Sequence, residues 1–163
     1  IATEGKDMVG KPLVGAPSLC VGAAADPGAK DLDVELQKVQ AKIASGVAFF
    51  QTQAVFDTKP LAEFMRRVKP CGTPVLAGIL LVKSAKMARY MNEHVWGIHV
   101  PEEIIDRFER TQDARAECLA VTSELVRAVR DIADGVHLYA LGWEELIPEI
   151  LANALLAPCP TKR

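Results

Sequence analysis

The chain has 163 residues, half of them hydrophobic and a quarter charged, with a formal net charge of −2. This is the composition of a globular domain that can bury a substantial core. Such a charge gives no electrostatic reason to expect nucleic acid or an anionic membrane as a partner. No apolar run reaches the roughly 20 residues of a membrane-spanning helix, and no signal peptide is visible. We therefore expect a cytoplasmic protein.

The first elements of the chain are an arm, a strand and a helix. Residues 1–17 are rich in Gly and Pro and are expected to form an N-terminal arm. Residues 18–25 are a short apolar run closed by Asp-Pro-Gly, which is typical of a buried strand. Asp31 is expected to cap a helix that Gly46 ends. The apolar stripe of this helix is formed by Leu32, Leu36, Val39 and Ile43.

A second strand and helix follow directly. Residues 47–56, "VAFFQTQAVF", predict a strand, and Asp57 or Thr58 is expected to cap the next helix, with Pro60 in its first turn. Residues 74–82 are apolar on both faces, as expected of a third strand buried in a parallel sheet.

The remaining chain is mostly helical. Three helices are expected before the next strand, over 84–95, 100–110 and 113–133. Residues 135–141 then predict a fourth strand and residues 143–156 a final helix. Apolar strands that alternate with helices indicate βαβ units, and hence an α/β fold with a parallel sheet.

Familiar metal and nucleotide motifs are missing from this sequence. There is no C-x-x-C pair, and neither G-x-G-x-x-G nor G-x-x-x-x-G-K-[ST] occurs at a strand–helix turn. His94 and His99 have a spacing that zinc sites use, but no cysteine pair accompanies them. We expect no metal site, and we expect the four cysteines to be free thiols: Cys20, Cys71, Cys118 and Cys159.

Two glutamines lie late in the second strand. Gln51 and Gln53 share one face with residue 49, because side chains alternate along a strand. A buried amide is costly unless it is hydrogen-bonded. Functional groups collect at the carboxyl ends of parallel strands, where a ligand could use these amides. The alternative is that both amides merely bond each other or a buried water.

The most specific motif in the strands is TQxxFD, within "KIASGVAFFQTQAVFD". This segment resembles the sixth strand of the methylenetetrahydrofolate reductase family, whose members are flavin-dependent (β/α)8 barrels, and the other strand ends resemble the same family in the same order. "GKPLVGAPSLCVGAAADP" resembles the fifth strand and "PVLAGILLVKSAKMARYM" the seventh. "GIHVPEEIIDRFER" resembles the helix that follows, and "GVHLYALGWEELIPEIL" the eighth strand and last helix.

The resemblance implies parallel (β/α) units that form the C-terminal half, strands five to eight, of a TIM-type (β/α)8 barrel. This half would occupy residues 18–157, between the arm of residues 1–17 and a tail of residues 158–163. Four strands cannot close such a barrel, so a partner is expected. It is either a missing N-terminal half or a second chain. The start at Ile1, without a Met, favours a missing half.

The resemblance also implies a function. The chain would be an incomplete part of a flavin-dependent oxidoreductase that interconverts 5,10-methylenetetrahydrofolate and 5-methyltetrahydrofolate, with FAD or alternatively FMN. Gln53 matches the glutamine that binds the pterin edge. Three further residues at strand ends are candidates for substrate binding: Gln51, Tyr139 and Trp143. No catalytic residue is expected in this chain, because the family's proton donor lies in the N-terminal half.

Four residues match positions near the flavin. Ala24 lies where the backbone approaches the cofactor, and Leu141 lies on the eighth strand beside it. Glu35 and Lys42 match positions that reach the flavin ribose and phosphate.

The sequence also departs from the family pattern. Gly142 and Trp143 stand where many members have Asn-Arg, and "AAADP" replaces an aromatic residue and a histidine. These departures resemble the branch found in anaerobic bacteria and in fusions with homocysteine methyltransferase modules, so an electron-transfer protein is an expected partner. They also leave open a non-catalytic folate-binding or partner subunit with the same barrel. An unrelated barrel enzyme with a phosphate site would need glycine-rich turns that are missing here.

Overall fold

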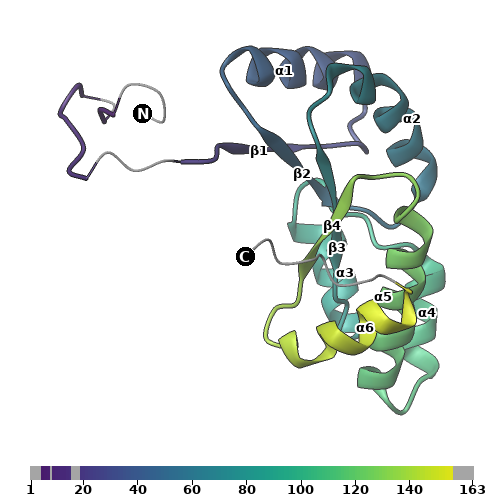
Figure 1. The fold of residues 1–163 in the computed structure, drawn as a ribbon. Coiled ribbons are helices and arrows are strands. Elements are labelled where there is room, and N and C mark those ends of the chain that lie inside the picture. Colours follow the sequence, from purple (N-terminus) through teal and green to yellow (C-terminus); the bar gives the residue numbers. More distant parts are fainter. Residues whose placement is uncertain (1–4, 8, 16–18, 156–163) are drawn as a thin grey trace.

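The computed structural model describes residues 5–7, 9–15 and 19–155. The expected tail of residues 158–163 lies outside them. The described chain alternates strands and helices in the expected order (Figure 1). The elements are β1 (Gly22–Ala25), α1 (Leu32–Ala44), β2 (Phe49–Ala54), α2 (Thr58–Val68), β3 (Val75–Leu80), α3 (Ala85–His94), α4 (Glu102–Arg110), α5 (Ala114–Val129), β4 (Gly135–Tyr139) and α6 (Ile147–Asn153).

The four strands form one parallel sheet in the order β1-β2-β3-β4. The α/β fold class and the parallel sheet are therefore confirmed. Each connection returns the chain to the starting end of the next strand, as a parallel sheet requires. All four carboxyl ends consequently meet at one edge of the sheet.

Two helices begin at capping residues that the sequence predicts. Asp31 accepts a hydrogen bond from the Val34 N–H at 3.0 Å and caps α1. Asp57, rather than Thr58, caps α2 by accepting from the Lys59 N–H at 2.9 Å. Each carboxylate satisfies a backbone N–H that the first turn of a helix leaves unpaired.

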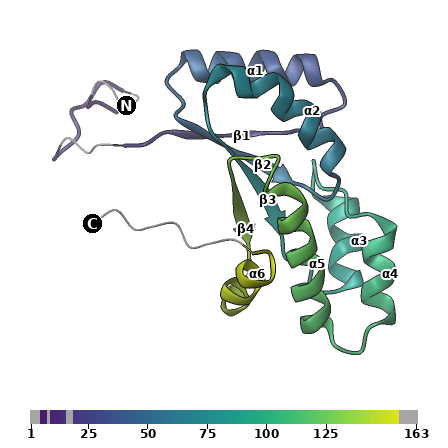
Figure 2. The same cartoon turned by 45° about the vertical axis from the view of Figure 1, so that its right-hand side comes forward.

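The helices cover one face of the sheet. Figures 1 and 2 show the helices gathered on one side, whereas no helix of the described chain lies over the opposite face. The alternation along β2 agrees with this arrangement: Phe50 and Thr52 are buried against the helices, and Phe49, Gln51 and Gln53 are half-buried on the uncovered face. The burial pattern along β2 thus follows the strand periodicity as far as Gln53, and the register with β3 shifts between Gln51 and Ala54.

Two helix boundaries differ from expectation. The third long helix, expected to reach residue 133, ends at Val129. The chain turns early because Asp134 joins the sheet: its carboxylate accepts the Val75 N–H at 2.9 Å, and its own N–H donates to the Val75 carbonyl at 3.0 Å. The final helix begins at Ile147, after a 3₁₀ turn over Glu144–Leu146, rather than at Trp143. Pro148 suits this first turn because it lacks an N–H.

In the part of the chain that the structure describes, no helix combines the length and the apolarity needed to span a bilayer.

Candidate functional site

A cleft of about 1010 Å³ opens at the carboxyl ends of β1 and β2. Asp26 and Gln53 line it from these two strand ends, and Lys38 lines it from α1. Its other wall is the loop between α3 and α4, residues 95–101, which we name the cover loop. Clefts at this edge of a parallel sheet are the usual place for a ligand.

A β-bulge at Thr52 and Gln53 shapes the floor of this cleft. The register between β2 and β3 shifts between Gln51 and Ala54. Thr52 fills the gap, since its Oγ1 accepts the Gly78 N–H at 2.9 Å and donates to the Gln53 carbonyl at 2.7 Å. The buried hydroxyl is therefore fully used in holding the bulge. Bulges of this kind re-aim a neighbouring side chain, here that of Gln53.

Close contact between strands also fixes the bulge. A methyl group at Gly78 would lie 2.5 Å from the Thr52 carbonyl oxygen and 3.0 Å from Tyr139 Cε2, so only glycine fits there. Tyr139 donates its hydroxyl hydrogen to the same Thr52 oxygen at 3.2 Å. Burial raises the pKa of the Tyr139 phenol, so this donor keeps its proton at neutral pH.

The amide of Gln53 is available to a ligand. The side chain is half-buried and lines the cleft, and no other described residue forms a hydrogen bond with its amide group. A half-buried amide without a protein partner can donate and accept at the same time. Gln53 is therefore the best placed of the predicted substrate-binding residues.

Gln51 has a different environment from Gln53. Its Nε2 lies 3.3 Å from Nδ1 of His137, and the His137 ring meets the Tyr139 ring edge-on with centroids 4.5 Å apart. These three side chains form a cluster on the uncovered face of the sheet and do not line the cleft. Gln51 thus bonds to His137 rather than to Gln53, and the Gln53 amide has no hydrogen-bonding partner among the described residues.

Trp143 lies outside the cleft as well. Its half-buried ring packs against the hydrophobic core, with Lys83 Nζ 5.0 Å and the Arg115 guanidinium 5.7 Å from its centroid. In this position Trp143 anchors the segment that leads into α6 against the core. Leu141, two residues earlier, is exposed with a φ of 53°, and its carbonyl accepts a hydrogen bond from Lys83.

Three of the four residues predicted to meet a cofactor lie around β1, whereas Leu141 follows β4 at the opposite edge of the sheet. Ala24 is exposed and small, and its carbonyl accepts a hydrogen bond from Lys42 Nζ at 2.7 Å. Glu35 is only 6% exposed, since its carboxylate accepts the Asp26 N–H at 3.1 Å and pairs with Lys38 at 3.3 Å. Ala24 has no side chain beyond Cβ, and the ammonium of Lys42 has further N–H groups that could donate to a phosphate. Glu35 is already engaged within the protein.

The pKa of Asp26, which lines the cleft, is shifted by its surroundings. Burial raises the pKa of its carboxyl group above the ordinary value of 3.8, and the neighbouring Glu35 carboxylate adds to the rise, while the N–H of Gly28 opposes it. The folded protein thus holds this proton more tightly than the unfolded chain does. The favourable contribution to stability is complete below pH 3.8 and is lost as the pH rises through the raised pKa.

An Asp26→Asn substitution is therefore expected to raise the melting temperature at pH 7. Asparagine keeps an oxygen for the Gly28 N–H, which Asp26 Oδ1 accepts at 2.9 Å, but carries no buried charge. The gain should shrink as the pH is lowered toward 4, as thermal unfolding across this range would measure. Asp57→Asn is the matched control, because Asp57 accepts the N–H two residues ahead but is exposed, and we expect no gain there. A gain from Asp26→Asn that grows at low pH would contradict this account.

The cover loop was not anticipated as part of the site. In the sequence Gly97 reads as a helix end, but α3 already ends at His94, and Gly97 lies within the loop with a φ of +80°. The available signal was a tryptophan and a glycine, "VWGIHVP", between two helices. Among the described residues, no group of three His, Cys, Asp or Glu side chains is arranged to hold a metal ion.

A solved structure shares this fold. It is that of an uncharacterized protein from Clostridium thermocellum that binds two copies of 5-methyl-5,6,7,8-tetrahydrofolic acid. The two chains are 21% identical with a TM-score of 0.55, and the match covers 85% of this chain and 53% of that one. The present chain thus spans about half the length of that protein.

A family assignment comes from the sequence itself. The model of the methylenetetrahydrofolate reductase family matches residues 15–155, which include all four strands, the Thr-Gln bulge and the cover loop. This match extends over most of the 163 residues. The resemblance seen in the strand motifs is thereby confirmed, and the chain belongs to the methylenetetrahydrofolate reductase family.

Proposed function

We propose that this chain is one part of a flavin-dependent oxidoreductase that interconverts 5,10-methylenetetrahydrofolate and 5-methyltetrahydrofolate. Residues 18–157 would supply strands five to eight of a (β/α)8 barrel, and an N-terminal half or a second chain would supply the others. Membership of the family supports this proposal. So do the uncovered sheet face and the open edges of β1 and β4, which need partner strands.

The placement of Gln53 is the observation that carries the proposal. Its amide lines the cleft and has no protein partner among the described residues, while the bulge at Thr52 holds its backbone. A primary amide can donate to a ring nitrogen or carbonyl oxygen and accept from a neighbouring N–H. The pterin ring of a folate offers donors and acceptors of this kind along one edge.

The chain's own residues would bind and orient both reactants. Gln53 would fix the pterin in plane, and the cover loop would restrict water at the cleft. Ala24 and Lys42 at β1, together with Leu141 after β4, would hold a flavin, FAD or FMN, from the two outer strands of the sheet. A bound flavin supplies hydride transfer, so the protein's task is orientation and electrostatics. We assign proton transfer to the partner strands and the supply of electrons to a separate electron-transfer protein.

A second candidate function is a folate-binding subunit without catalysis. It is favoured by the protein from Clostridium thermocellum, which shares the fold and is described as binding 5-methyltetrahydrofolic acid. The replacement of Asn-Arg by Gly142 and Trp143 points the same way. In this second candidate the cleft with Gln53 still binds folate, but no flavin is needed.

A product assay on the complete, anaerobically purified protein separates the two candidates. The enzyme should carry bound flavin and should form 5-methyltetrahydrofolate from 5,10-methylenetetrahydrofolate when an artificial reductant supplies electrons. A protein that binds 5-methyltetrahydrofolate in calorimetry, but holds no flavin and forms no product, would be the binding subunit. A protein that does neither would overturn both candidates.

A further inference from the structure

The cover loop reaches across the cleft toward its floor. A methyl group at Gly97 would lie 3.6 Å from Gln53 Cγ and 3.8 Å from Asp26 Oδ2, so the loop passes close to both strand ends at Gly97. The residue beside this contact point is Trp96, which also lines the cleft. The indole of Trp96 and the Gln53 amide that we assign to ligand binding thus line the same cleft.

Trp96 is unusually exposed for its type. Its side chain is 81% exposed, although tryptophan is normally among the well-buried residues. Trp143 shows the ordinary situation, since it is half-buried against the core. A large aromatic side chain left open at the rim of a cleft is characteristic of a surface that receives a ligand.

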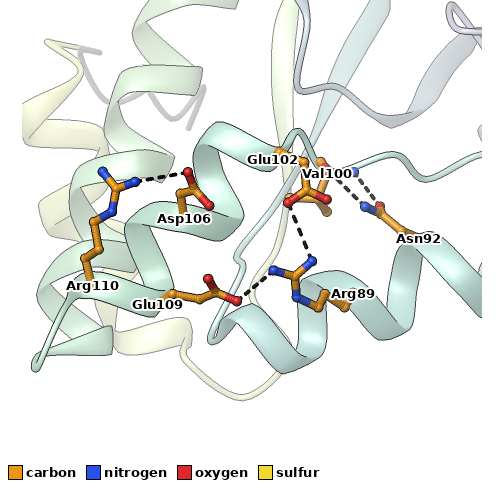
Figure 3. Close-up of polar contacts among 7 residues, drawn as sticks. All are labelled: Arg89, Asn92, Val100, Glu102, Asp106, Glu109 and Arg110. Carbon is orange, nitrogen blue, oxygen red and sulfur yellow. Dashed lines mark hydrogen bonds and ion pairs between the residues drawn. The ribbon is translucent and has the colours of Figure 1, made fainter.

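The cover loop is held firmly at both ends (Figure 3). The Asn92 amide donates to the Val100 carbonyl at 2.9 Å and accepts the Val100 N–H at 2.7 Å, which ties the loop end to α3. Arg89 joins α3 to α4 through Glu109 at 2.7 Å and Glu102 at 3.5 Å. Trp96 is therefore carried on a loop whose end is tied to α3, so a ligand that binds there need not order the whole loop.

We propose that Trp96 is a binding residue whose indole stacks on the pterin ring of the ligand while Gln53 binds the edge of that ring. The inference rests on the proposed function. In that function Gln53 contacts the edge of the pterin ring, and the inference adds a contact between Trp96 and the face of the same ring. Gly97 suits this loop because its φ of +80° lies in the left-handed region, which residues with a side chain rarely adopt. A flat ring between the indole and the floor of the cleft would be held both by stacking and by hydrogen bonds.

Calorimetric titration of the complete protein with 5-methyltetrahydrofolate tests this proposal. Trp96→Ala should raise the Kd about tenfold, and Trp96→Phe should restore most of the affinity. The melting temperature should not change, because the side chain is largely exposed. Tyr90→Ala is the matched control: Tyr90 is an exposed aromatic residue on α3 that stacks on His94 and does not line the cleft, so its loss should leave the Kd unchanged.

A truncated ligand, 6-methyltetrahydropterin, identifies the ring that is stacked. If Trp96 stacks on the pterin, Trp96→Ala should weaken both ligands by a similar factor, whereas a loss confined to the full folate would overturn the assignment. An unchanged Kd for Trp96→Ala, alongside weakened binding by Gln53→Ala, would overturn the role of Trp96 and leave the proposed function standing. Wild-type protein that binds neither ligand would overturn the proposed function and this inference together.

Discussion

A Gly78→Ala substitution should destabilise the protein by about 3 kcal/mol, the upper part of the usual range for overpacking. The added methyl group would lie 2.5 Å from the Thr52 carbonyl oxygen and 3.1 Å from the Gln53 carbonyl oxygen. Both atoms belong to the backbone, so strands β2 and β3 would have to move apart. The hydrogen bond from the Gly78 N–H to Thr52 Oγ1 would be strained at the same time. Thermal unfolding of the complete protein should show the loss as a lower melting temperature.

Gly135→Ala is the matched control for this experiment. A methyl group there would lie 2.8 Å from Cδ2 of Leu76, which is the end of a flexible side chain and can rotate away. We expect a cost of about 1 kcal/mol or less, partly offset by the smaller entropy of the unfolded alanine chain. Equal melting temperatures for the two variants would show that β2 and β3 are not as closely packed at the bulge as described.

A Gln53→Ala substitution should weaken the binding of 5-methyltetrahydrofolate by a factor of about 10 to 100, because the edge of the pterin would lose its hydrogen-bonding partner. The melting temperature should change little, since the Gln53 amide bonds to no other described residue. Calorimetry and thermal unfolding of the same preparation measure the two effects. A variant that unfolds readily, but binds with unchanged affinity in its folded fraction, would make Gln53 a structural residue.

Gln51→Ala is the control, because we expect it to lower the melting temperature and to leave the affinity almost unchanged. Gln51 lies on the same strand face, but its amide contacts His137 at 3.3 Å. Removing it should lower the melting temperature, because His137 loses its partner on the half-buried face of the sheet. We expect the affinity for 5-methyltetrahydrofolate to stay within about threefold of wild type, a difference of less than 1 kcal/mol.

The order of the elements could be predicted from the sequence because its signals are local. Apolar runs mark the four strands, and Asp31 and Asp57 cap the helices that the periodicity predicts. The bulge could not be predicted, since it depends on contacts between distant residues. Thr52 Oγ1 bonds to Gly78, 26 residues away, and the Thr52 carbonyl accepts from Tyr139, 87 residues away.

The site was predictable only in part, for the same reason. Strand alternation places Gln51 and Gln53 on one face, but it cannot tell which amide is free. That distinction depends on His137, 86 residues beyond Gln51. The cover loop also escaped prediction, because nothing local in "VWGIHVP" indicates that Gly97 will lie near Gln53. The functional surface thus arises from tertiary contacts that periodicity and caps do not encode.

Anaerobic titration of the complete, flavin-loaded protein with 5-methyltetrahydrofolate tests the proposed reaction most directly. The visible absorbance of the oxidised flavin should fall in step with the appearance of 5,10-methylenetetrahydrofolate. The Gln53→Ala variant should need higher folate concentrations for the same change. If calorimetry shows that 5-methyltetrahydrofolate binds but the flavin absorbance stays constant, the proposed oxidoreductase activity is contradicted. The protein would then bind folate without reducing or oxidising it.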